Sequence, residues 1–360
     1  MNDHQAPLIG YTCAYTPLAL IDAAGFTPYR IFPLGEWPDQ AGRLLHDNLC
    51  PHIKRVLDRA LDHDLPELAG MVFINSCDAM RRLADAWKQI RPEDKLIILD
   101  LPPTAGEINI SFYADEVRWL WNTLNAWKDS GGESWTDEPA VRKIEESIKK
   151  YNDLSVLLAE THDKIRQNKL RGGSPRMQEI YNLASTNPIE HTISHLKGLE
   201  DYGGASKDTG VPVFVFGNML ADPDVFSLFE ESGAAVQDSD FCTGSRLFHA
   251  MDPMYIEKSE DIFINLSRHI LSHPPCARTF NPSSPAKIAS DILEKTRACN
   301  AKGVIGHIMK FCDPYLARIP MIRKALQNEG IPMLVLEGDC TTRSIGQQKT
   351  RIEAFIEMLR

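Results

Sequence analysis

Four continuous apolar runs of strand length constrain the fold of this chain more than any other feature. They lack the alternation of polar and apolar residues, which is typical of strands buried on both faces of a parallel sheet. Segments with helical spacing follow them, and strands that alternate with helices predict parallel sheets covered by helices. The runs are Gly70–Asn75, Lys95–Asp100, Val211–Phe216 and Gly303–Met309.

The runs form two groups separated by a helical stretch. Further strands are expected at Pro7–Tyr11 and Tyr29–Phe32 in the first group and at Ile331–Glu337 in the second. Between the groups, Pro139–Gln167 repeats apolar residues at spacings of three and four, which is typical of an amphipathic helix. We therefore predict two Rossmann- or flavodoxin-like parallel-sheet domains joined by a helical connector. The expected bounds are 1–105, 106–205 and 206–360.

Composition narrows the class of protein. The chain has 360 residues, of which 43% are hydrophobic and 24% charged, as in an ordinary globular protein. Its net charge of −10 disfavours nucleic acid as a partner, because an acidic surface repels phosphate backbones. The apolar runs are too short to span a bilayer, and the N-terminus lacks the pattern of a secretory signal. We predict a cytoplasmic protein without a membrane span.

Several cysteines stand where a strand is followed by a helix. Cys77 and Cys312 each come directly after a buried strand, Cys13 follows the first strand, and Cys50 precedes Pro51 at a helix start. In open α/β sheets, ligands bind beyond the carboxyl ends of the strands. A helix N-terminus also favours the thiolate, which is the form that binds metal. These thiols are therefore candidate metal ligands at a domain interface.

The alternative for each cysteine is a buried thiol that acts as a small hydrophobic side chain. The chain has no Cys-x-x-Cys pair, which disfavours a zinc ribbon or a ferredoxin-type cluster. Cys299 lies in an amphipathic helix and is interpreted as structural. Cys340 is ambiguous, and Cys242 and Cys276 are either ligands or neighbours of the site.

The segments around these cysteines resemble the 2-hydroxyacyl-CoA dehydratase and benzoyl-CoA reductase subunit family, of the 2-hydroxyglutaryl-CoA dehydratase D-component type. The resemblance covers nearly the whole chain, and the motifs occur in the family's order. They are Ile9–Pro17 (IGYTCAYTP), Leu49–Pro51 (LCP), Asn75–Arg82 (NSCDAMRR), Cys242–Arg246 (CTGSR), Lys310–Tyr315 (KFCDPY) and Gln348–Phe355 (QKTRIEAF).

The resemblance implies a [4Fe-4S] cluster held by three cysteines, with one iron free of protein thiolate. The matching positions are Cys50, Cys77 and Cys312, here called the first thiol set, with Cys13 in reserve. In dehydratase members, an ATP-dependent activator protein supplies one electron. Water then leaves an (R)-2-hydroxyacyl-CoA substrate through a ketyl radical. The implied partners are this activator and a second homologous subunit or a second copy of the chain.

Two alternatives stay open. One is a low-potential reductase, either of the benzoyl-CoA reductase type or with a double-cubane [8Fe-9S] cluster. Cys13, Cys242 and Cys276, here called the second thiol set, would suit the double-cubane branch. The other is a non-catalytic electron-relay subunit. The sequence does not specify the acyl group.

Other residues near the motifs are weaker candidates. Arg246 is a candidate phosphate contact, and Tyr11 and Tyr15 either line a substrate pocket or pack in the core. His307 lies in a buried strand and is interpreted as structural. Asp78 and Asp313, each next to a cysteine of the first thiol set, are expected to cap helices, since Asp is a preferred N-cap, or else to adjust the charge around a cluster.

Overall fold

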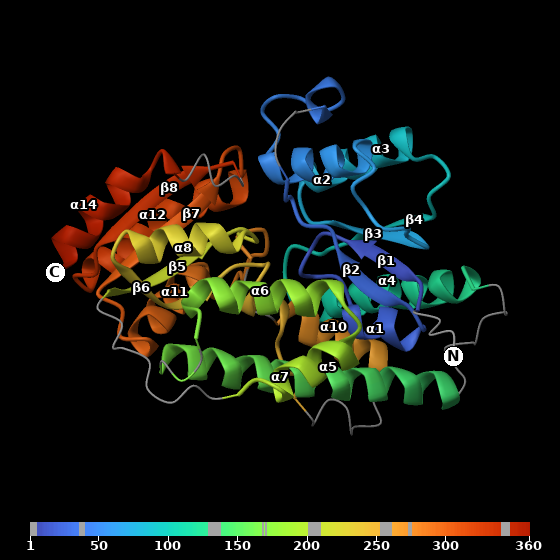
Figure 1. The fold of residues 1–360 in the computed structure, drawn as a ribbon. Coiled ribbons are helices and arrows are strands. Elements are labelled where there is room, and N and C mark those ends of the chain that lie inside the picture. Colours follow the sequence, from blue (N-terminus) through green and yellow to red (C-terminus); the bar gives the residue numbers. More distant parts are fainter. Residues whose placement is uncertain are drawn as a thin grey trace.

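Two four-stranded sheets, each with all strands parallel, form the framework of the described residues (Figure 1). The structure is a computed structural model, and it describes residues 6–35, 40–128, 138–167, 169, 171–200, 210–252, 261–272, 276–339 and 346–360. Helices connect and cover the strands. The predicted α/β fold class with two flavodoxin-like parallel sheets is confirmed.

The first sheet has the strand order β2-β1-β3-β4. The flavodoxin-like order also begins with strand 2 beside strand 1 and strand 3 on its other side. Ile9 pairs with Pro28 on one side and Gly70 on the other. The elements of this half are β1 (Leu8–Tyr11), α1 (Leu18–Ala23), β2 (Thr27–Arg30), the 3₁₀ helix η1 (Ala41–Arg43), α2 (Pro51–Leu61), β3 (Gly70–Asn75), α3 (Asp78–Ile90) and β4 (Leu96–Asp100).

The second sheet repeats this arrangement in the order β6-β5-β7-β8. Its central strand β7 is buried along its whole length, as its continuous apolar run predicts. The elements are β5 (Val211–Gly217), α8 (Pro223–Glu231), β6 (Ala234–Asp240), η2 (Ser245–Leu247), α10 (Ile262–Leu271), α11 (Lys287–Ala298), β7 (Gly303–Met309), α12 (Asp313–Asn328), β8 (Met333–Gly338) and α14 (Lys349–Leu359).

Four helices lie between the two sheets in the chain: α4 (Glu107–Ala126), α5 (Glu138–Arg166), α6 (Gly173–Thr186) and α7 (Ile189–Lys197). Helix α6 contacts β2 of the first sheet and both β6 and α8 of the second. In Figure 1, α6 accordingly crosses the middle of the view from one half to the other, and α5 runs along the bottom. The helices thus hold the two sheets in one fixed arrangement.

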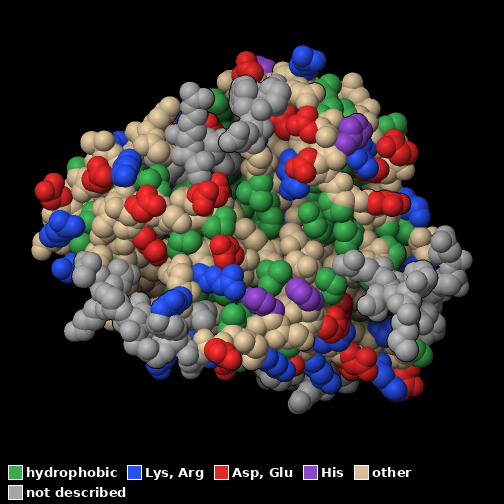
Figure 2. All heavy atoms as spheres, in the orientation of Figure 1, with side chains coloured by type: hydrophobic (Ala, Val, Ile, Leu, Met, Phe, Trp, Pro, Cys, Tyr) green, Lys and Arg blue, Asp and Glu red, His purple; other side chains and the backbone are tan. Residues whose placement is uncertain are grey.

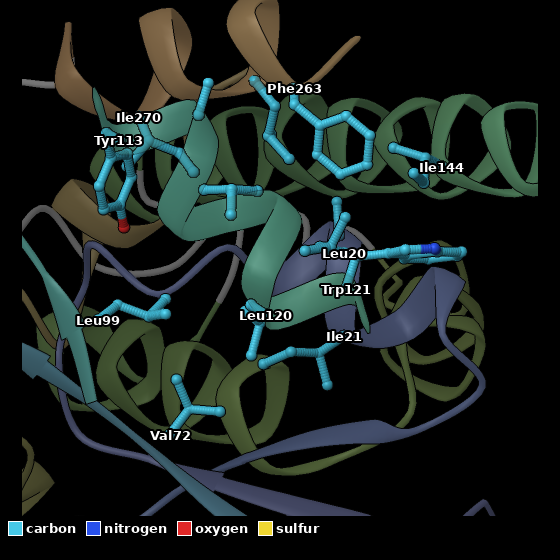
Figure 3. Close-up of a cluster of buried hydrophobic side chains, with 14 of the residues drawn as sticks. Leu20, Ile21, Val72, Leu99, Tyr113, Leu120, Trp121, Ile144, Phe263 and Ile270 are labelled. Atoms are coloured by element: carbon cyan, nitrogen blue, oxygen red, sulfur yellow. The ribbon is translucent and has the colours of Figure 1, made fainter. Parts of the chain in front are cut away.

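Helix α4 packs on the first sheet and also against α10, which lies much later in the chain. Figure 3 shows this core, in which Leu120 and Trp121 of α4 lie near Ile21 and Leu20 of α1, while Phe263 of α10 approaches from the far side. The second half of the chain therefore returns to complete the core of the first half. The predicted domain bounds at 105 and 205 stay a prediction.

Residues 173–197 form two helices rather than one. Pro188 separates α6 from α7, and the residue before it, Asn187, has extended backbone angles. A proline disfavours helical geometry in the residue that precedes it, so the helix ends there. Asp261 is the N-cap of α10, and its side chain accepts a hydrogen bond from the backbone N–H of Phe263. No helix in the described ranges has the length and apolar character needed to cross a membrane.

Candidate functional site

A cavity of about 110 Å³ opens where the carboxyl ends of the two sheets face each other. Its walls come from the segments that follow β1, β3, β5, β6 and β7, and from the start of α2. On the face drawn in Figure 2, hydrophobic side chains gather near the centre, where the two halves of the molecule meet. The cavity lies at the position where open α/β sheets bind their ligands.

Six cysteines line this one cavity. They are the three residues of the first thiol set and the three residues of the second. The chain segments that carry them are as far apart as the β1–α1 loop and the β7–α12 junction. The structure thus brings together all four cysteines expected as ligands, together with Cys242 and Cys276. Their role as ligands stays a prediction.

The first thiol set occupies helix N-caps. Cys50 is the N-cap of α2, Cys77 of α3 and Cys312 of α12, and none of the three side chains makes a capping hydrogen bond. Proline begins α2 and stands in the first turn of α12, where its missing N–H costs nothing. All three cysteines line the cavity from these helix starts.

The backbone before Cys312 is strained. Phe311 has a φ of 59°, in the left-handed region that bulky residues rarely adopt, and its side chain is exposed. This turn carries the chain from the end of β7 to the start of α12. It places Cys312 at the cavity wall.

Asp78 and Asp313 do not cap their helices, contrary to the expectation from the sequence. Each is the first helical residue, and the preceding cysteine holds the N-cap position. A carboxylate in the first turn still interacts favourably with the helix dipole.

Burial dominates the acidity of the thiols. It raises the pKa of Cys50 to about 11 and that of Cys312 to about 12, although backbone N–H groups at the helix starts act to lower both. The pKa of Cys77 is also raised by burial, and that of Cys13 reaches about 12. The expected thiolates at helix N-termini are therefore thiols in the metal-free protein. Desolvation outweighs the helix dipole here.

Four polar atoms on the cavity wall have no hydrogen-bond partner in the described part of the chain. They are Thr12 Oγ1, His52 Nε2, Arg246 Nη1 and Tyr315 Oη. Unpaired buried polar groups are rare in native proteins and often mark a missing ligand. These groups can all donate hydrogen bonds, so the cavity suits a group rich in acceptors.

Arg246 is not free to reach a solvent-exposed phosphate, as the sequence had led us to expect. It is buried, and its Nε donates to Asp240 Oδ1 at 2.7 Å, while Lys295 Nζ donates to Asp240 Oδ2 at 2.7 Å. Burial acts to raise the pKa of Asp240, but the charges of Arg246 and Lys295 hold it well below its usual range. The arginine is thus fixed in the wall by an internal ion pair.

Tyr11 and Tyr15 have different roles. Tyr15 lines the cavity, and its hydroxyl lies 3.0 Å from Thr279 Oγ1, which ties the segment around Cys276 to the first sheet. Tyr11 is fully buried and donates to the carbonyl oxygen of Ser185 at 3.4 Å. Tyr15 thus lines the cavity, and its contact with a substrate stays a prediction, whereas Tyr11 follows the packing alternative.

The remaining cysteines and the buried histidine follow the structural interpretation where the structure describes them. Cys299 is buried at the end of α11, and its Sγ lies 3.4 Å from the carbonyl oxygen of Thr296. His307 is fully buried in β7. Cys340 lies outside the described residues.

Arg30 was missed by the sequence reasoning. This residue ends β2, is fully buried, and reaches Cys242 from behind the cavity wall. The signal that could have found it is a charged residue inside a short strand of an otherwise apolar sheet.

Within the described residues, no three His, Cys, Asp or Glu side chains stand close enough to hold a single metal ion. The donor set nevertheless fits an iron–sulfur group, since thiolates are the usual cluster ligands and free N–H groups can bond their sulfurs.

Fold and site together define a protein of two parallel α/β sheets with a thiol-lined cavity between their carboxyl ends. The chain belongs to the family described as 2-hydroxyglutaryl-CoA dehydratase, D-component, whose model matches residues 13–359. The predicted family and the predicted enzyme subunit of dehydratase or reductase type are thereby confirmed.

Relatives from three organisms cover most of the chain. It is 24% identical to the (R)-phenyllactyl-CoA dehydratase beta subunit of Clostridium sporogenes, over 98% of this chain and 91% of the relative. It is 23% identical to a benzoyl-CoA reductase subunit of Thauera aromatica, over 92% and 85% of the two chains. The beta subunit of (R)-2-hydroxyglutaryl-CoA dehydratase from Acidaminococcus fermentans is 23% identical, over 98% and 92%.

Proposed function

We propose that this chain is the iron–sulfur subunit of a 2-hydroxyacyl-CoA dehydratase-type enzyme. The observation that carries the proposal is the convergence of the first thiol set on one buried cavity. Cys50, Cys77 and Cys312 would hold a [4Fe-4S] cluster there, with Cys13 in reserve. The enzyme would work in the cytoplasm, where thiols stay reduced.

When bound, the cluster would supply one-electron chemistry at low potential, for the removal of water from an (R)-2-hydroxyacyl-CoA. The chain's own residues prepare the site. The thiols must release their protons to bind metal, since burial has raised their pKa values. Apolar walls, including Met80 and Met309, exclude water. The buried Arg246 lines the same cavity, where Asp240 neutralises its charge.

The proposal includes partners. The relatives from Clostridium sporogenes and Acidaminococcus fermentans are named as beta subunits, which supports a multi-subunit enzyme. We expect a second homologous subunit or a second copy of the chain, and a separate ATP-dependent activator that delivers the electron. The acyl-CoA substrate would bind with its thioester near the cavity.

A second candidate function is a reductase with a double-cubane [8Fe-9S] cluster. The observation in its favour is that the second thiol set lines the same cavity as the first. Six thiols from one chain would then serve a larger cluster. The benzoyl-CoA reductase relative from Thauera aromatica also keeps reductase chemistry open, and a non-catalytic relay subunit would use the same single cluster without a substrate.

Iron and acid-labile sulfide per chain, measured after anaerobic purification, test the proposal first. About four of each support a single cluster, and about twice as much supports the double-cubane alternative. Serine variants of the first thiol set should lose the cluster, whereas Cys299→Ser should keep it, because Cys299 is buried away from the cavity. Iron loss in serine variants of the second thiol set as well would favour the double cubane.

A protein that takes up neither iron nor sulfide, even after reconstitution, would refute both cluster proposals. A spectral change on adding a 2-hydroxyacyl-CoA separates the catalytic subunit from a relay subunit. The change should appear with the substrate and not with free coenzyme A.

A further inference from the structure

A buried arginine stands behind the cavity wall. Arg30 is fully buried, and the rings of Tyr11 and Phe32 lie 5.8 and 5.7 Å from its guanidinium carbon. Its Nη1 donates to the carbonyl oxygen of Cys242. Its Nη2 lies 3.3 Å from the carbonyl oxygen of Thr12 and 3.4 Å from Cys242 Sγ. Both Cys242 and Thr12 line the cavity.

The charge of Arg30 lacks the usual compensation. Among the described residues it forms no ion pair with a carboxylate, and its Nε has no hydrogen-bond partner. Arg246 differs, because Asp240 neutralises it. A guanidinium stays charged in proteins, and burial of an unpaired charge is costly. Polar contacts to two carbonyl oxygens reduce this cost but supply no negative charge.

The contacts of Arg30 indicate that a negative charge in the cavity would compensate its buried positive charge. Arg30 contacts both the carbonyl oxygen and the sulfur of Cys242, and Cys242 is one of the residues that line the cavity. Arg246 lines the same cavity, but Asp240 neutralises its charge. Arg30 thus lies behind a cavity whose lining, among the described residues, includes no carboxylate.

We propose that Arg30 is the internal counter-ion of an anionic group bound in the thiol-lined cavity. The identity of that group as an iron–sulfur cluster rests on the proposed function, whereas the sign of its charge does not. Arg30 acts through Cys242 and Thr12 and does not itself line the cavity, so it is a positioning residue. A fixed positive charge near the cluster stabilises the added electron and raises the reduction potential.

Four proteins test this: the wild type, Arg30→Met, Arg30→Lys and Arg91→Met, each prepared anaerobically with and without the cluster. Arg91 is a matched control, since it contacts an aromatic ring, that of Trp87, but is paired with Asp94 and lies away from the cavity. The readouts are the thermal midpoint of both forms, the rate of iron loss to a chelator, and the midpoint reduction potential.

Arg30→Met should lose iron about tenfold faster than the wild type, as expected for removal of a charge-assisted contact. Its reduction potential should fall, and the gain in thermal midpoint on cluster binding should shrink. Arg30→Lys, which keeps the charge, should retain most of the wild-type potential. Arg91→Met should leave the iron-loss rate and the potential unchanged.

A purely structural role for Arg30 predicts a different result. Arg30→Met would then lower the thermal midpoints of the empty and loaded forms equally, with unchanged iron loss and potential, and the proposal would be overturned. A wild type that binds no iron would instead refute the proposed function. In that case, sodium sulfate should stabilise the empty wild type more than Arg30→Met, and an equal gain would overturn the counter-ion proposal.

Discussion

The substitution Asp240→Asn should destabilise the folded protein, because Asp240 forms a buried ion pair with Arg246. The two side chains are 7% and 4% exposed, and Lys295 completes the cluster on the other carboxylate oxygen. Asparagine keeps the shape of the side chain but removes the charge, so Arg246 would remain buried without an anion. Breaking a buried pair in this way costs about 3–5 kcal/mol. That is a large part of the stability of a typical domain.

Urea unfolding of the metal-free protein at pH 7 measures this cost. The control is Glu138→Gln, which removes an exposed pair with Arg142 and should change the unfolding free energy by less than about 1 kcal/mol. The double variant Asp240→Asn/Arg246→Met should recover part of the loss, because it removes both charges. A loss below about 1 kcal/mol for Asp240→Asn would refute the reasoning.

The pH dependence of the same pair has a defined sign. The pKa of Asp240 is lowered in the folded state, so the pair contributes its full stability above the unfolded-state value of 3.8. The stability that the ion pair contributes is lost as the pH falls below 3.8, because the carboxylate of Asp240 takes up a proton more readily in the unfolded chain. Asp240→Asn should therefore be destabilised most at neutral pH and least in acid.

Three further predictions test the fold around the site. Burial lowers the pKa of His307 from 6.5 to about 4, so the unfolded chain binds a proton at a higher pH than the folded protein does. The free energy of unfolding of the wild type should therefore fall by up to about 3 kcal/mol as the pH is lowered from 6.5 to 4. Urea unfolding at pH 7 and 4.5 should show a smaller loss for His307→Leu than for the wild type, and an equal loss would contradict this role of His307. Gly217→Ala would place its Cβ 1.9 Å from the carbonyl oxygen of His307 and should destabilise by about 1–3 kcal/mol or more in urea, whereas Gly106→Ala, with no atom nearer than 4.0 Å, should not. Trp121→Ala should lower the free energy of unfolding by about 3–5 kcal/mol, because the side chain of Trp121 is fully buried in the core shown in Figure 3. Thermal unfolding measures this loss, and a smaller value would mean that neighbouring side chains move into the cavity.

The strands could be predicted because their signal is local. Gly70–Asn75 and Gly303–Met309 have the same bounds in the structure as in the sequence analysis. A continuous apolar run marks a strand buried on both faces wherever it occurs in the chain. The break between α6 and α7 is also a local signal, because Pro188 disfavours helical geometry in the residue before it.

The candidate ligands and their gathering at a domain interface could be proposed from their positions in the sequence, but whether Cys242 and Cys276 belong to the site stayed open. The sequence places Cys50, Cys77 and Cys312 at helix starts, and the structure adds that they share one cavity with the second thiol set. Resemblance to the family supplied the cluster hypothesis, since spacing alone left each thiol open to a structural role. The expected low thiol pKa was wrong because it considered only the helix N-terminus and not the burial of the whole site.

By itself, the sequence determined the α/β class, the strand and helix order, and the position of cysteines between strands and helices. These follow from backbone preferences and hydrophobic spacing over a few neighbouring residues. Only the tertiary structure decided that six thiols face one space, that Arg30 stands behind Cys242, and that Arg246 is held by Asp240. Burial and polar contacts arise between segments as far apart as Tyr15 and Thr279, which are 264 residues apart, so no local pattern can specify them.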